Sequence, residues 1–64
     1  MLSNQEIEKL KISTSRHLRG LIQDAEPYLK YMNDNHPGQW QEHVRYYEIL
    51  VSVAKAVLAS RGEL

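Results

Sequence analysis

The chain has 64 residues, with eight Lys and Arg, eight Asp and Glu, no Cys and a formal net charge of zero. This length allows a single domain, residues 1–64, and a chain this short rarely buries enough apolar surface to be stable alone. Without cysteine there are no disulfides or thiolate metal sites, and the balanced charge excludes a strong overall attraction to nucleic acid or to an anionic membrane. We therefore expect association with another chain to supply stability.

The N-terminal sequence lacks the basic and then apolar segments that are typical of a signal peptide. The longest apolar stretch, residues 49–59, is too short to span a bilayer and contains Ser52 and Lys55. These features predict a soluble, cytoplasmic protein.

The first residues predict the start of a helix. Ser3 is a suitable N-cap, Glu6 can complete a capping box, and Leu2 can pack on Ile7 as a hydrophobic staple. From there apolar residues recur along one stripe about 120° wide at 100° per residue. Its members are Ile7, Leu10, Leu18, Leu21, Ile22, Ala25, Tyr28, Leu29 and Met32. The pattern predicts one long helix over about residues 3–32.

Gly20 and Pro27 oppose this helix, because glycine weakens a helix interior and proline removes a backbone donor. Both lie away from the apolar stripe, so we favour one helix kinked near these two residues. The alternative ends a helix near Gln23 and begins another with Asp24 as its N-cap, which gives three helices in all.

Residues 33–37 are rich in turn formers and predict the connection to a second helix. Pro37 is suited to the first position of that helix, which runs over about residues 37–61 and ends before Gly62. The expected fold is therefore all-α, an antiparallel helical hairpin.

The second helix has an apolar surface too wide for one neighbouring helix. Its residues form two adjoining rows, which are Trp40, Val44, Tyr47, Val51, Ala54 and Leu58 in the first, and Tyr46, Leu50, Val53 and Val57 in the second. The first helix covers only one row, and monomers seldom leave the other exposed. The second row is thus predicted to mediate self-association, giving a homodimer built as a four-helix bundle, or a higher homo-oligomer.

No residue pattern indicates catalysis, a cofactor or a metal. His17, His36 and His43 have no spacing that places two metal ligands on adjacent helical turns, and nothing is placed to activate Ser13, Thr14 or Ser15 as a nucleophile. The three glycines stand apart, which argues against a phosphate-binding loop. We expect a protein that is not an enzyme and that has no cofactor.

Two surface features favour partner binding. Lys9, Arg16 and Arg19 form a basic segment with Lys11, and the apolar Ile12 lies on the same outward face. Arginine around an apolar anchor is typical of protein interfaces. Aromatic residues gather near the bend, where Tyr28, Trp40 and Tyr47 are expected in the core. Tyr31 is expected to point outward and to contact a partner.

These observations lead to three hypotheses about function. The first is a small inhibitor or regulator, of the kind found in phages or plasmids, that docks on another protein through a helix face. The second is a nucleic-acid-binding dimer that uses the basic segment at residues 9–19. The third is an oligomer that captures a small ligand or nucleotide between protomers.

Overall fold

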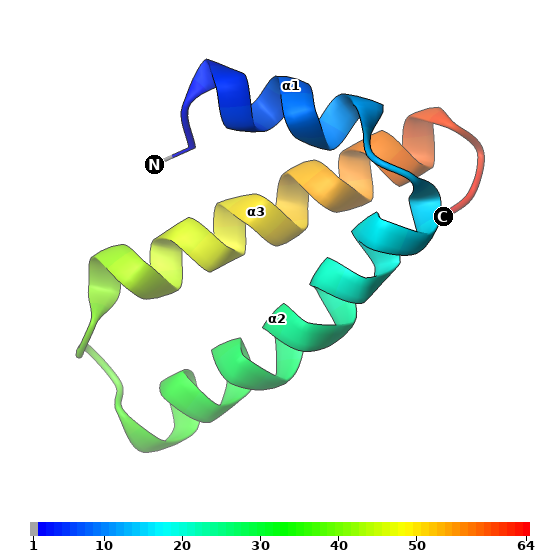
Figure 1. Ribbon diagram of the computed structural model, residues 1–64. Coiled ribbons are helices and arrows are strands. Elements are labelled where there is room, and N and C mark those ends of the chain that lie inside the picture. The colour runs from blue at the N-terminus through cyan, green and yellow to red at the C-terminus, as the bar shows by residue number, and fades with distance from the viewer. Residues whose placement is uncertain (1) are drawn as a thin grey trace.

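The computed structural model describes residues 2–64, which form three α-helices and no strand. α1 spans Asn4–Ile12, α2 spans Ser15–Asn35 and α3 spans Gln41–Ser60. Figure 1 shows α3 between the other two helices, with α1 parallel to it and α2 antiparallel. The all-α class is confirmed. The two-helix hairpin is wrong, because the first predicted helix is divided into α1 and α2.

The division falls at Ser13 and Thr14, both of which have extended backbone. The Thr14 hydroxyl accepts a hydrogen bond from the His17 N–H at 3.1 Å and so caps α2. The Ser13 hydroxyl donates to the Lys9 carbonyl at 2.7 Å, at the end of α1. The alternative division near Gln23 is also wrong, since α2 continues through Gly20 and Pro27.

The N-terminal end of α1 agrees with the prediction. The Ser3 hydroxyl accepts a hydrogen bond from the Glu6 N–H at 3.2 Å, as an N-cap should. Leu2 is buried, and Ile7 packs against the core cluster that contains it, as expected for a hydrophobic staple. The capping residues thus fix where the first helix begins.

The loop between α2 and α3 comes later than predicted. α2 runs to Asn35, and α3 begins at Gln41 rather than at Pro37. Gly38 has φ of +82° and Trp40 has φ of +55°, so two loop residues adopt the left-handed conformation. This loop carries Trp40 out of the core in which it was expected.

The C-terminal end of α3 follows the prediction closely. Gly62 has φ of +73°, and its N–H donates to the Ala59 carbonyl at 3.0 Å. The Glu63 N–H donates to the Leu58 carbonyl at 2.9 Å, which completes a Schellman motif. The predicted helix end before Gly62 is confirmed.

All three helices contribute to one core cluster, which lies on α3. Its buried members are Leu2, Leu10, Leu18, Ala54 and Leu58. The second row of α3, predicted to mediate self-association, packs partly buried against this cluster; the row is Tyr46, Leu50, Val53 and Val57. Because α1 folds back along α3, the chain itself covers the first row from Val44 onward and part of the second. The wide apolar face of α3 therefore no longer requires a dimer.

Candidate protein-docking site

The most exposed aromatic side chain is that of Trp40, which precedes the first turn of α3. Its backbone is left-handed, with φ of +55° and ψ of 37°, and its side chain makes no capping hydrogen bond. Its carbonyl accepts from the Val44 N–H at 2.9 Å and so begins the helix. The indole is 71% exposed. A bulky residue in this conformation costs about 1 kcal/mol or more, and such strain clusters at functional positions.

A shallow hollow of about 560 Å³ lies beside the indole. We call its lining the Trp40 surface, which consists of Trp40, Gln41, Glu42, His43 and Tyr46. The hollow opens to solvent and is formed by consecutive turns at the start of one helix. It therefore presents a large apolar ring next to carboxylate, amide and imidazole groups, a mixture suited to a protein partner.

Aromatic packing supports this surface from within. The Tyr28 ring on α2 lies 5.1 Å from that of Tyr47 and 5.9 Å from that of His43. Tyr47 also packs edge-on against His43 at 5.1 Å and against Tyr46 at 5.5 Å. Such pairs favour tilted and T-shaped geometry and restrict ring motion. The first turns of α3 are thus held in place by rings from both α2 and α3.

The other edge of the Trp40 surface is joined to α1 by one hydrogen bond. The Tyr46 hydroxyl donates to the Glu6 carboxylate at 2.8 Å. This bond, helped by the Ser3 backbone and hydroxyl, lowers the pKa of Glu6 below its ordinary value despite partial desolvation. The same bond is the main cause that raises the pKa of Tyr46. Both shifts favour the ionised carboxylate beside the neutral phenol.

These two shifts predict how the stability of the protein depends on pH. A lowered Glu6 pKa adds stability above its unfolded value of about 4.3, and this is lost as pH falls through the folded value. A raised Tyr46 pKa adds stability below about 10, which is lost as pH rises through the folded value. We expect Tyr46→Phe to flatten both changes in urea unfolding measured across pH. Tyr31→Phe, which removes an exposed hydroxyl elsewhere, is the control and should leave them intact.

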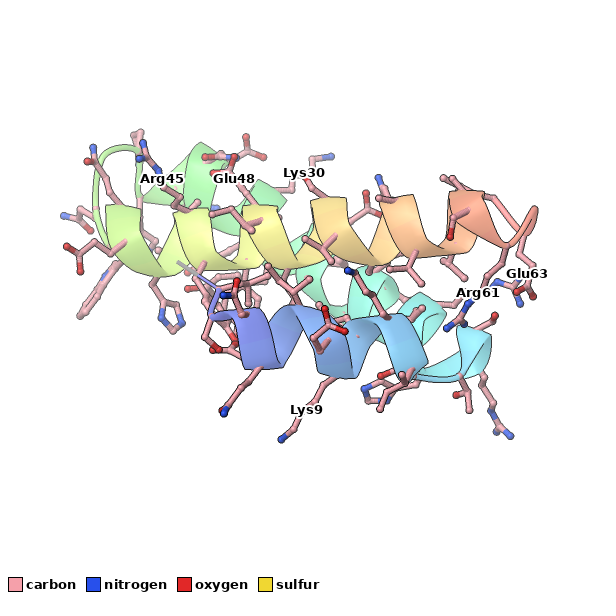
Figure 2. All side chains as sticks on the ribbon, turned by 90° about the horizontal axis from the view of Figure 1, so that it is seen from above. Lys9, Lys30, Arg45, Glu48, Arg61 and Glu63 are labelled. Atoms are coloured by element: carbon pink, nitrogen blue, oxygen red, sulfur yellow. The ribbon has the colours of Figure 1, made fainter. Side chains whose placement is uncertain are left out.

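The structure divides the predicted basic site between two helices. Ile12 is 83% exposed at the end of α1, while Arg16 and Arg19 lie on α2 beyond the break. Lys9 points away from α3 (Figure 2). Arg19 forms an ion pair with Glu63 at 3.6 Å, and Lys11 pairs with Glu8 at 3.3 Å. Over residues 2–64, the side chains of Lys9 and Arg16 take part in no hydrogen bond or ion pair, so these two keep the exposure that partner binding requires.

Arg61 makes contacts that the sequence pattern did not predict. Its guanidinium donates to the Lys11 carbonyl at 2.8 Å and to the Ser13 carbonyl at 2.7 Å. It also donates to the Ser15 hydroxyl at 3.1 Å, and that hydroxyl donates to the Glu63 carboxylate. Arg61 and Glu63 lie together at this end of the molecule (Figure 2). A cation on the last carbonyls of α1 is favourable for that helix and fixes the break.

Tyr31 lies apart from the other predicted partner-binding residues. It is 51% exposed near the end of α2, where its ring lies 5.5 Å from that of His36. Fifteen residues of helix separate it from Arg16, or about 22 Å. Tyr31 and the basic site therefore cannot form one compact contact surface.

Two further findings concern chemistry and membranes. Among residues 2–64, no three His, Asp or Glu side chains are grouped so as to hold a metal ion. Over the same residues, no helix combines the length and the apolar character needed to cross a bilayer.

The exposed Trp40 was missed because the apolar pattern placed it in the first row of the second helix. The Pro37–Gly38 pair, a common turn sequence, is the signal that indicates a later helix start. With the helix beginning at Gln41, the apolar rows start at Val44 and Trp40 falls in the loop. The backbone contacts of Arg61 have no comparable signal in the sequence.

The fold and the surface together define an all-α protein of three helices with an exposed aromatic anchor. Comparisons with protein-family models, with curated proteins and with solved structures found no match to this chain. The Trp40 surface itself therefore carries the evidence about function.

Proposed function

We propose that this chain is a small, non-enzymatic interaction protein, an inhibitor or regulator, that docks on another protein through the Trp40 surface. The observation that carries the proposal is the exposed indole of Trp40, presented in a strained backbone conformation on a well-packed helix start. Tryptophan is the residue most enriched among those that dominate binding energy at interfaces. A rigid support reduces the entropy lost on binding.

The neighbours of Trp40 fit this role. His43, Glu42 and Gln41 supply hydrogen-bonding groups around the ring, as the polar rim of an interface does. Tyr46 continues the surface toward α1 through its bond to Glu6. A partner with an apolar pocket bordered by polar groups would match this arrangement.

The strain at Trp40 allows stability and binding to be separated. Asparagine tolerates the left-handed conformation better than tryptophan does, so Trp40→Asn should leave the fold at least as stable, with a gain of about 1 kcal/mol. The same change should remove partner binding. We expect capture from the native host lysate to recover a partner with the wild type and to lose it with Trp40→Asn.

Ile12→Asn is the matched control, because it removes another strongly exposed apolar side chain, that of Ile12 on the predicted basic site. Retention of the partner by Ile12→Asn supports the Trp40 surface, whereas loss only with Ile12→Asn would place the contact at the predicted basic site. Trp40 is the single tryptophan, so its fluorescence reports directly on this surface. Emission should shift to shorter wavelength when the partner binds. An unchanged spectrum in the complex would contradict the proposal.

The ion pairs around the basic segment make nucleic-acid binding a less favoured function than docking on a protein. Lys11 and Arg19 are already paired with Glu8 and Glu63. Each cation that neutralises a phosphate adds to affinity, so two free cations, Lys9 and Arg16, provide little. Ile12, Lys9 and Arg16 remain the alternative contact surface for a protein partner, which the Ile12→Asn variant tests.

A further inference from the structure

The break between α1 and α2 depends on very few torsion angles. Ser13 has φ of −70° and ψ of 154°, and Thr14 has φ of −67° and ψ of 152°. Both φ values are already those of an α-helix, in which ψ is about −42°. Rotation of these two ψ angles alone would therefore join α1 and α2 into one continuous helix.

The sequence on both sides of the break suits such a helix. At 100° per residue, Ile7 and Leu10 of α1 fall on the same stripe as Leu18 and Leu21 of α2. Ser13 and Thr14 are only slightly poorer helix formers than most residues. The apolar faces of α1 and α2 would thus remain aligned in the straight form.

α1 packs mainly on α3 and much less on α2. Leu10 and Ile7 of α1 pack in the core cluster to which α3 contributes, and the Glu6 carboxylate accepts a hydrogen bond from the Tyr46 hydroxyl. None of these contacts depends on whether α1 and α3 belong to the same chain. A second copy of the chain has an identical α1, which can make the same contacts with α3 of the first copy.

We propose that α1 is exchanged between two copies of this chain, giving a domain-swapped dimer in which α1 and α2 form one helix. Each α1 then packs on α3 of the other copy. The exchange breaks the Thr14 cap and the Arg61 contacts with Lys11 and Ser13, and it adds helical backbone hydrogen bonds across the former break. The apolar contacts between α1 and α3 and the bond from Tyr46 to Glu6 form again between the copies, so the equilibrium between monomer and dimer depends on the free energy of the break and on protein concentration.

The directions of the helices fix the shape of this dimer. α1 runs parallel to α3, and α2 runs antiparallel to it (Figure 1). A straight helix over residues 4–35 is about 48 Å long and carries α1 beyond the C-terminal end of its own α3. The two copies therefore meet end to end in an elongated dimer, which differs from the compact four-helix bundle expected from the sequence.

Two variants shift this equilibrium in opposite directions. Ser13→Ala combined with Thr14→Ala removes the cap and favours continuous helix, so the dimer dissociation constant should fall by roughly tenfold or more. Ser15→Pro fits the bent form, because position 15 begins α2 and Thr14 is extended, as a residue before proline prefers. In a continuous helix that proline would clash with the Lys11 carbonyl. Ser15→Pro should sediment as a monomer at every concentration.

Cross-linking identifies which chain supplies α1. The chain has no cysteine, so a Glu6→Cys copy can be mixed with a Tyr46→Cys copy, each in the Ser13→Ala, Thr14→Ala background, and treated with a short bismaleimide. A covalent product between different copies is expected. Lys9→Cys replaces Glu6→Cys as the control, because Lys9 points away from α3 (Figure 2) and should give no product.

Sedimentation and cross-linking each provide a result that overturns the proposal. It fails if the double-alanine protein remains helical and monomeric from micromolar to millimolar concentration. It also fails if that protein dimerises without the product between positions 6 and 46, which would indicate a different interface. Dimerisation of Ser15→Pro as strong as that of the wild type would contradict it independently.

Discussion

Leu18→Ala is expected to lower the free energy of unfolding by about 2–5 kcal/mol, enough to leave a large share of a protein this small unfolded at room temperature. Leu18 has no exposed surface and lies on α2. It packs in the cluster that also contains Leu10 of α1 and Leu58 of α3. Its removal leaves a cavity where all three helices meet. Urea unfolding followed by circular dichroism measures the loss.

Leu64→Ala provides the matched control for this prediction. Leu64 is 73% exposed, so the same chemical change there should alter the unfolding free energy by less than about 0.5 kcal/mol. Equal effects of the two substitutions would show that Leu18 is not at the centre of the core.

Pro27→Ala is expected to have the opposite sign and to raise the free energy of unfolding by up to about 3 kcal/mol. Pro27 is exposed and lies in the interior of α2, where it cannot donate to the Gln23 carbonyl. Alanine restores this hydrogen bond and removes the clash of the ring, while no core contact is lost. Thermal unfolding should show the gain as a higher Tm.

Gly20→Ala tests the same effect, the replacement of a residue that is unfavourable in a helix interior, with a smaller expected gain in unfolding free energy. A Cβ built at Gly20 meets nothing within 4 Å, so alanine should gain about 1 kcal/mol from helix propensity alone. Gly62→Ala should instead destabilise the protein, because Gly62 needs φ of +73°. A gain at Gly20 without one at Pro27 would mean that α2 has already adapted to the proline.

Helix ends with short-range signals could be predicted from the sequence. Ser3 and Glu6 act within one helical turn, and Gly62 is the residue type that a left-handed cap requires. The apolar stripe was also correct for Leu10, Leu18, Ala25 and Met32, all of which are buried. These features depend on local geometry, which periodicity describes well.

The break at Ser13 and Thr14 could not be found from periodicity, because the apolar residues stay in phase across it. Three consecutive hydroxyl residues at 13–15 were the available signal, since such side chains compete for backbone hydrogen bonds and favour caps. The bend is stabilised by a residue that is distant in the sequence, because the Arg61 guanidinium donates hydrogen bonds to the Lys11 and Ser13 carbonyls. This bend also brings α1 onto the second row of α3. A prediction without the bend left that row exposed and therefore included a dimer to bury it.

The candidate site was predicted only in part. Ile12 and Tyr31 are exposed, as expected, but the break and the length of α2 separate them. Trp40 was assigned to the core because an aromatic residue matched the helical spacing. Its true position depends on left-handed backbone at Gly38 and Trp40, which apolar patterning does not describe.

The central position of α3 has a consequence for synthesis of the protein. α1 and α2 leave the ribosome before α3, and they share little surface with each other. Most of the stability of a helix in a protein comes from the packing of its apolar face, so we expect both segments to remain loosely structured until α3 follows. These three helices can therefore pack only once α3 has been made, and until then a nascent chain exposes the apolar stripe of α1 and α2 to chaperones, proteases and neighbouring chains.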